Sequence, residues 1–435
     1  MLTTIRRTTM LALVLAPSLQ AQSGSDIARR VAQAPDGEVH LSFASRASAC
    51  GDGKDVVGIG ENFITSRTME SYGRWSNMRC VPGPARVSLT MRGHEVVDMR
   101  THIGGSWPAD AERVTDLGRV PARDAAEYFL SLATTLGSSG RSNPLLAAAV
   151  ADSTNVSPEM LRLARTASLP RETRRRAIHW AGTLGDASTV APLVALARAS
   201  EDGRNNPDDV GPGDSMEGAA VGALSMIPDG AGTPALMELA RRASPTARKA
   251  AVFWLGQGGE PAGRALVRTI AADDRESETL RGAAIFALGE GDEASTADDR
   301  FLRDLFPKLT SERLKDRVLM SVSQHQAADG ARWLLAQARD DHQPIEVRRK
   351  AVFWAGQGQA TVADLTALYA AATESRLREH IVFVLSQRSE ESATSVLMSI
   401  ARSDADREMR RKALFWLAQK DDPRVTKLIT DLVSH

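Results

Sequence analysis

A short sequence pattern that recurs along the second part of this chain constrains its fold more than any other feature. EVRRKAVFWAGQG occupies residues 346–358, EMRRKALFWLAQK occupies 408–420 and TARKAAVFWLGQG occupies 246–258. Aligned on Trp354, equivalent positions recur about every 30–34 residues after one longer first interval, at Trp180, Ala223, Trp254, Ala287, Ser321, Trp354, Val384 and Trp416. A fixed period of this length is typical of solenoids and arrays.

Each period predicts a first helix around the aligned position, a short Gly/Gln turn, and a second helix such as ATVADLTALYAAA at 360–372. The longer first interval contains EDGRNNPDDVGPGD at 201–214, a polar segment that predicts a surface loop. We therefore expect an α-solenoid of about eight helical hairpins over residues 170–435. Residues 122–169 predict a helical capping or linker segment, in which Ser157 before Pro158 is expected to cap a helix.

The repeated pattern resembles the HEAT-like repeats of the phycobilisome-lyase type, whose units have the form V-R-x-x-A-x-x-A-L-G. LRGAAIFALGEG at 280–291 matches it at Arg281, Ala284, Ala287, Leu288 and Gly289, and the 346–358 segment matches it at Val347, Arg348, Ala351 and Gly356. The resemblance covers about 170–435. It implies a solenoid whose second helices line a concave face, and such solenoids are mostly binding scaffolds.

Four tryptophans stand where that family usually has alanine: Trp180, Trp254, Trp354 and Trp416. On a helical wheel, Trp354 lies on the shoulder of the core face that Val347 and Ala351 mark. We expect this tryptophan column to pack between stacked units, where losing one ring costs about 3–5 kcal/mol. The alternative is an aromatic row displayed for a ligand.

A glutamine column follows three positions later, at Gln257, Gln324, Gln357, Gln387 and Gln419. Together with Phe353 and its counterparts, Gln357 lies nearly opposite Ala351 on the helical wheel. Each glutamine either binds the unpaired carbonyls at the end of its helix or belongs to a polar ladder that faces a partner. The second possibility makes the column a candidate partner-binding set.

A basic column lies six positions before the aligned residue: Arg174, Arg248, Arg281, Lys315, Arg348, Arg378 and Arg410. Cations near a helix N-terminus are unfavourable, so acidic residues of the preceding loops, such as Asp273, Asp341 and Asp406, are expected to pair with them. We expect an inter-repeat ladder rather than a nucleic-acid stripe. Lys+Arg and Asp+Glu both number 54, and this neutrality argues against a nucleic-acid partner.

The first residues are typical of a cleavable signal peptide. Arg6 and Arg7 precede an apolar stretch at 10–16 that is too short to span a bilayer, and a small-residue cleavage site ends near Ala21. A frayed N-terminal helix is the alternative. The signal peptide, residues 1–21, predicts a periplasmic or secreted protein, and no later segment is apolar enough to predict a transmembrane helix.

Residues 22–121 predict a small β-rich domain that contains both cysteines, Cys50 and Cys80. Alternating segments at 38–43 and 85–91, with a turn at 92–95 leading into 96–103, indicate strands and a hairpin. In an oxidising compartment an even cysteine pair usually forms a disulfide. A pair of metal-binding thiols is the alternative, but no histidine lies at ligand spacing.

No motif predicts a catalytic residue, a metal site or a cofactor. The repeats lack the His-Glu pairs with which one HEAT-type enzyme family holds iron, and the chain has no phosphate-binding glycine loop. We therefore predict an exported scaffold or adaptor that binds a protein or peptide partner through the solenoid surface. The alternative is an enzyme or enzyme subunit with its site in the N-terminal domain or at the junction with the solenoid, with His94, Glu95, His102 and Trp107 as first suspects.

Overall fold

The computed structural model describes residues 23–54, 56–60, 62–65, 80–107, 113–138, 142–199, 215–290, 296–325 and 328–433. The predicted signal peptide lies outside these residues. Contacts divide the chain into an N-terminal unit, Met1–Gly185, and a repeat unit, Asp186–His435. The domain boundaries that we infer from sequence, after residues 21, 121 and 169, stay predictions.

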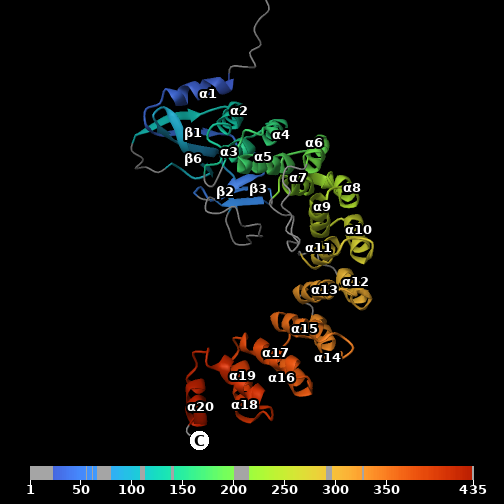
Figure 1. Cartoon of the computed structure of the whole chain (residues 1–435). Helices are drawn as coiled ribbons and strands as arrows, with labels where there is room; N and C mark the ends of the chain where they lie inside the picture. The colour runs from blue at the N-terminus through green and yellow to red at the C-terminus, as the bar shows by residue number, and fades with distance from the viewer. Residues whose placement is uncertain are drawn as a thin grey trace, which may run out of the picture. The chain divides into compact units, whose positions relative to one another are not determined.

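The N-terminal unit contains a four-stranded sheet in the order β6-β5-β1-β7. Figure 1 labels two of its strands, β1 and β6. β1 (Gly37–Phe43) pairs antiparallel with β5 (Ala85–Arg92) and parallel with β7 (Val114–Arg119), and β5 continues into β6 (Glu95–Ile103). At the turn between β5 and β6, Gly93 and His94 have φ angles of 60° and 65°. The strands and the hairpin predicted from alternation are confirmed.

Five helices belong to the same unit: α1 (Ser23–Ala32), α2 (Ala122–Leu132), α3 (Pro144–Val150), α4 (Ser157–Arg165) and α5 (Arg171–Thr183). The sheet and α2 meet in the core, where Phe43 lies 6.0 Å from Phe129 between ring centroids. The expectation that Ser157 caps α4 is wrong. Val156 occupies the cap position, and the Ser157 hydroxyl is buried without a hydrogen bond to any described residue.

A second, three-stranded sheet consists of β2 (Ala49–Gly51), β3 (Val56–Ile59) and β4 (Asn62–Thr65). Cys50 of β2 forms a disulfide with Cys80, as predicted, and no free cysteine remains. The two cysteines are 30 residues apart in sequence, so the crosslink stabilises the unit by about 3–4 kcal/mol through restriction of the unfolded chain.

Paired helices of the repeat follow one another along the chain, which confirms the predicted solenoid. In sequence order the first helix of the first pair is α5, which belongs to the N-terminal unit. The other first helices are α7 (Met216–Ser225), α9 (Pro245–Gln257), α11 (Glu278–Gly289), α13 (Glu312–Gln324), α15 (Ile345–Gln357), α17 (Ser375–Ser386) and α19 (Arg407–Leu417). The second helices are α6 (Ala187–Arg198), α8 (Thr233–Arg241), α10 (Pro261–Ala272), α12 (Thr296–Leu305), α14 (Ala328–Arg339), α16 (Val362–Ala371), α18 (Glu391–Ser403) and α20 (Pro423–Val433).

The start of several first helices is specified locally. Four serines accept a hydrogen bond from the backbone amide three residues later and so cap α7, α9, α11 and α13: Ser215, Ser244, Ser277 and Ser311. Such a cap stabilises a helix by about 1 kcal/mol. These serines recur 29, 33 and 34 residues apart, close to the period of the repeat, and they are a sequence signal for the helix boundaries.

Within the repeat unit, first helices pack on first helices from α7 to α19, and they form one layer while the second helices form another (Figure 1). The layer is close-packed at glycines two positions after the aligned residue. A side chain on Gly256 would lie 2.6 Å from Cβ of Ala287 in the next unit, and Gly356 lies similarly close to Val384. Glycine is therefore required two positions after the aligned residue of a repeat when the aligned residue of the next repeat is small.

Candidate partner-binding surface

Several arginines of the basic column bind the carbonyl oxygens at the end of the preceding second helix. Nε of Arg348 lies 3.0 Å from the carbonyl oxygen of Ala338 in the last turn of α14. Three other arginines make the same contact: Arg174 with Ala164 at 2.9 Å, Arg248 with Ala240 at 2.9 Å, and Arg281 with Ala271 at 3.2 Å. The last carbonyls of a helix lack intrahelical partners, so each arginine satisfies one of them.

Two of these guanidinium groups also reach forward to an acid in the loop before the next first helix. Nη2 of Arg248 lies 2.5 Å from Glu276, and Arg348 pairs with Glu374. The expectation that the acids come from the preceding loops is wrong for Arg348, because Asp341 contacts His342 instead. Because Nε of each arginine binds the preceding second helix, its Nη atoms are directed toward the next repeat.

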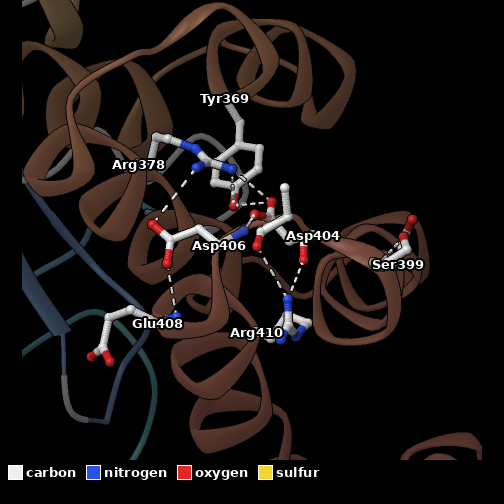
Figure 2. A network of polar contacts seen from close by, with 9 residues as sticks. Tyr369, Arg378, Ser399, Asp404, Asp406, Glu408 and Arg410 are labelled. Carbon is white, nitrogen blue, oxygen red and sulfur yellow. Dashed lines mark hydrogen bonds and ion pairs between the residues drawn. The ribbon is translucent and has the colours of Figure 1, made fainter.

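Two further members of the basic column, Arg378 and Arg410, belong to one polar network near the C-terminal repeats, which Figure 2 shows. Arg378 donates to Asp404 at 2.6 Å and to the Tyr369 hydroxyl at 3.0 Å, and Tyr369 donates to Asp404 at 2.6 Å. Nη1 of Arg410 donates to the backbone carbonyl of Asp404 at 2.6 Å. The network joins α16, α17 and the loop before α19.

The electrostatics of this network favour the charged form of Asp404. Burial would raise its pKa, but hydrogen bonds from Tyr369, the Asp406 amide and Arg378 lower the pKa below its usual value. Asp406, named from sequence as a partner of Arg410, instead lies 3.9 Å from Arg378 and accepts from the Glu408 amide. Lys315, the last member of the basic column to be described, donates through Nζ to Gln343 at 2.8 Å.

The tryptophan column lies in different environments along the chain. Trp180 of the N-terminal unit is 1% exposed, whereas Trp254, Trp354 and Trp416 of the repeat unit are half-buried. The Trp254 ring lies against Gly222 of the preceding repeat, since a Cβ there would be 3.1 Å from its Nε1. Nε1 of Trp354 donates to Asp316 of the preceding repeat at 2.7 Å.

A covariation that we did not detect in the sequence accompanies this column. In the repeat unit, glycine stands two positions after the aligned residue wherever the next unit has a small aligned residue: Gly256, Gly289 and Gly356 precede Ala287, Ser321 and Val384. Serine stands there wherever the next unit has tryptophan: Ser225, Ser323 and Ser386 precede Trp254, Trp354 and Trp416. This alternation supports inter-repeat packing as the role of the tryptophans, which remains a proposal.

The solvent-facing side of the first helices carries one large side chain per unit beside the tryptophans. We call this the aromatic row: Phe253, Phe286, Met320, Phe353, Phe383 and Phe415. Rings of adjacent units approach one another, with Phe253 and Phe286 stacked at 6.3 Å between centroids. The first five are half-buried and Phe415 is 58% exposed. The row is therefore an incompletely covered apolar surface.

The glutamine column lies beside the aromatic row. Gln324, Gln357, Gln387 and Gln419 are exposed and Gln257 is half-buried. Among described residues, only Gln419 binds a carbonyl of its own helix, that of Phe415, at a long 3.5 Å. Gln324 donates to Glu290 of the preceding unit at 2.8 Å, and Gln387 donates to Ser386 at 3.1 Å. Helix-end capping therefore accounts for little of this column.

The N-terminal suspects for an enzyme site do not converge. His94 and Glu95 lie exposed at the β5–β6 turn, while His102 lies at the other end of β6, roughly 23 Å away at 3.3 Å per residue. His102 donates through Nδ1 to the Lys54 carbonyl at 2.5 Å. Trp107 stacks on His40 at 3.8 Å between ring centroids and lies 4.8 Å from the Arg86 guanidinium carbon.

A groove of about 790 Å³ lies between α2, α4 and the loop at 153–156 of the N-terminal unit. Its charged groups are already paired within their own helices, Arg123 with Glu127 at 3.1 Å and Arg162 with Glu159 at 2.8 Å. Neither histidine nor cysteine lines it. The groove therefore presents hydroxyls and neutralised charges rather than an acid–base pair.

Among the described residues, one group of three side chains has metal-ligand spacing: Asp340, Asp341 and His342. Two of the three are exposed, and exposed acidic groups are common without an ion. The expectation of no metal site therefore stays a prediction. No described helix is both long and apolar enough to cross a membrane.

Comparison with known proteins gives no family for the chain. No family model matches it, and no curated protein does so. Similar solved structures include human deoxyhypusine hydroxylase in complex with glycerol, with 18% identity over 60% of this chain and 94% of that chain and a TM-score of 0.25. A homology model of the AP-3 complex in an intermediate open conformation has 15% identity over 64% of this chain and 53% of that chain, with a TM-score of 0.37.

The complex of CpcE and CpcF of phycocyanin lyase from Nostoc sp. PCC7120 has 16% identity over 64% of this chain and 95% of that chain, with a TM-score of 0.29. The assignment of the fold therefore follows from the helix pairing of the chain itself. It is an α-helical repeat protein with a small, disulfide-linked β domain at its N-terminal end.

Proposed function

We propose that this protein is an exported scaffold with HEAT-like repeats that binds a protein or peptide partner through the solvent-facing side of its first helices. The observation that carries the proposal is the periodic row of half-buried aromatic and exposed glutamine side chains on this side. Exposed positions of the second helices carry no equivalent aromatic row among the described residues: they hold small residues such as Ala367 of α16 and charged residues such as Asp304 of α12. A repeated surface of this kind suits an extended partner.

Two further observations support parts of the proposal. The Cys50–Cys80 disulfide is typical of oxidising compartments, and export would supply one. The equal numbers of basic and acidic residues favour a protein partner over nucleic acid. Export is tested by sequencing the N-terminus of the native protein, which should begin near Gln22; retention of Met1 would contradict it.

The binding surface is tested by placing a photo-crosslinking amino acid at Gln357 and, in a matched variant, at Ala367 on the second-helix side. Both positions are exposed and belong to the same hairpin. The variants are irradiated in the native cell envelope, and adducts are identified by mass spectrometry. We expect a discrete protein adduct at Gln357 and none at Ala367.

An adduct at Ala367 alone would mean that the second helices bind the partner, as the family resemblance implies, and would overturn our choice of side. Failure of both positions, and of further probes at Gln324 and Gln419, would count against a scaffold role. The two results separate the function from the face that performs it.

A further inference from the structure

The last two repeats end the aromatic row in a cluster of three rings, of which one is more exposed than any other member of the row. Phe383 of α17 lies 5.3 Å from Trp416 of α19, and Phe415 lies 5.1 Å from Trp416, between ring centroids. Phe415 is 58% exposed, and it is the most exposed large apolar side chain among the described residues. We call these three residues the C-terminal aromatic cluster.

The indole N–H of Trp416 distinguishes this cluster from the equivalent positions. Nε1 of Trp354 is occupied by Asp316, and Nε1 of Trp254 is buried without a partner. Nε1 of Trp416 donates to no described residue and is not among the buried polar atoms. It is therefore a solvent-accessible donor within an apolar surface, and it calls for an acceptor such as a carbonyl oxygen.

The charges around the cluster are already compensated. Lys412 of α19 pairs with Glu379 of α17 at 2.5 Å, and Arg411 pairs with Glu408 at 2.8 Å. The neighbouring amides of Gln387 and Gln419 are neutral and exposed. The complementary occupant is therefore an uncharged segment that offers apolar rings and free carbonyl oxygens, rather than an acidic or basic peptide.

We propose that the C-terminal aromatic cluster binds a proline-rich segment of a partner protein in the polyproline II conformation. The proposal rests on the scaffold function and names the class of partner. A polyproline II helix has no internal hydrogen bonds, so its carbonyls are free to accept from Trp416, and its prolyl rings pack on aromatic faces. Its rigidity before binding reduces the entropy lost on association.

The dimensions of the repeat fit this ligand. Polyproline II completes a turn in three residues and about 9.3 Å, and packed helices lie about 8–10 Å apart. Prolines three residues apart therefore meet α17 and α19 in turn, one ring against Phe383 and the next against Phe415. An extended β-strand has a period of two residues and does not match one side chain per repeat.

The test measures binding of fluorescein-labelled decaproline to the full mature chain by fluorescence anisotropy, with a (Gly-Ser)₅ peptide of equal length as the control ligand. We expect saturable binding of decaproline and none of the control. Phe415→Ser should weaken binding at least about tenfold, as expected for an aromatic anchor. Trp416→Phe keeps a ring but removes the donor, and it should weaken binding about three- to tenfold.

Val97→Ser, which replaces an exposed apolar side chain of the N-terminal unit, should leave binding unchanged and serves as the matched control. Thermal melts establish that each variant folds. Absence of decaproline binding, equal binding of the Gly-Ser peptide, or full binding by both cluster variants would overturn the proposal. So would sedimentation data in which Phe415→Ser disperses a dimer while decaproline has no effect, because the occupant would then be a second copy of the chain.

Failure of this proposal is distinguishable from failure of the scaffold function. If crosslinking at Gln357 captures a partner but decaproline does not bind, the scaffold function stands and the proline-rich ligand is wrong. If no position on the first helices captures a protein, the scaffold function itself is wrong.

Discussion

Arg86 of the N-terminal unit and Arg348 of the repeat unit bind backbone carbonyls in the same way but are recognisable from sequence to different degrees. Arg86 donates through Nε to Gly104 at 2.7 Å and through Nη2 to Gly53 at 2.9 Å, and so joins segments 18 and 33 residues away. Arg348 donates to Ala338, only 10 residues away. The contact of Arg348 is local and recurs in other units, whereas that of Arg86 occurs once.

This difference explains how each unit is stabilised. The N-terminal unit depends on single, long-range features such as the disulfide, the parallel pairing of β1 with β7 and the contacts of Arg86. The repeat unit distributes its stability over equivalent contacts between neighbours, as a one-dimensional array does. Loss of one such feature should therefore affect the whole N-terminal unit, whereas loss of any contact in the repeat unit should affect mainly the neighbouring repeats.

The largest expected effect comes from a unique feature inside the repeat unit, which tests that generalisation. Asp298 of α12 is 0% exposed and accepts from Arg264 at 2.7 Å and from Arg268 at 2.6 Å. Asp298→Ala leaves the buried Arg264 without its carboxylate and should destabilise the surrounding repeats by about 3–5 kcal/mol. Hydrogen exchange of α10 to α13 measures this local loss.

Asp304→Ala, on the exposed side of the same helix, is the control and should change stability by less than about 0.5 kcal/mol. Equal exchange protection in the Asp298 and Asp304 variants would contradict a structural role for the buried network.

The second prediction concerns the covalent link of the N-terminal unit. The double substitution Cys50→Ser and Cys80→Ser should lower the free energy of unfolding of that unit by about 3–4 kcal/mol, because the unfolded chain regains its freedom. The repeat unit should keep its denaturation midpoint. Urea unfolding followed by exchange mass spectrometry separates the two units, and a matching shift in α13–α19 would refute independent stabilisation.

The third prediction compares the same repeat position in the two units. Trp180→Ala should cost about 3–5 kcal/mol because Trp180 is fully buried, and Trp354→Ala should cost about 2–3 kcal/mol because its ring is half-buried. Thermal unfolding with exchange detection measures both. If Trp354→Ala leaves the melt unchanged but abolishes crosslinking at Gln357, the tryptophan column serves recognition rather than packing.

The smallest effect concerns acid sensitivity, to which each unit contributes one histidine. Burial, with Arg176 nearby, lowers the pKa of His179 to about 4. Burial also lowers the pKa of His380 to about 4. The nearby charges of Arg349 and Lys350 add to this shift, and Glu346 opposes it. In the unfolded chain each histidine has a pKa near 6.5, so it takes up a proton at a higher pH than the folded histidine does. The free energy of unfolding is therefore largest above pH 6.5 and decreases as the pH falls toward 4.

His380→Gln should therefore flatten the stability of the repeat unit between pH 6.5 and 4, measured by urea unfolding across that range. His94→Asn, at an exposed turn of the N-terminal unit, is the control substitution for the repeat-unit measurement. An unaltered slope in the His380 variant would assign the acid sensitivity to other groups.

The predictable part of the fold consists of features that repeat or alternate. The period around Trp354, the alternation in 38–43 and 85–91, and the cysteine pair led to the paired helices of the solenoid, the β hairpin and the disulfide. The expected loop acids for Arg348 were wrong, because sequence order does not show in which direction along the stack a guanidinium extends. The capping role of Ser157 failed because the helix begins after Val156.

The candidate surface was predictable only in its composition. Sequence placed Gln357 and Phe353 on the side opposite Ala351, since helical periodicity determines which residues share a face. It could not determine that Trp180 is buried while Trp416 reaches solvent, because both occupy the same position in the repeat. Exposure depends on what the neighbouring units supply.

The sequence by itself determined the repeat, the strands of the β hairpin, the neutral charge of the chain and the pairing of its two cysteines. These properties follow from local spacing and composition. Only the tertiary structure decided the strand order β6-β5-β1-β7, the pairing of Arg348 with Glu374, the burial of Asp298 between two arginines and the open end of the aromatic row. Those depend on contacts between segments far apart in sequence, which no single-residue pattern records.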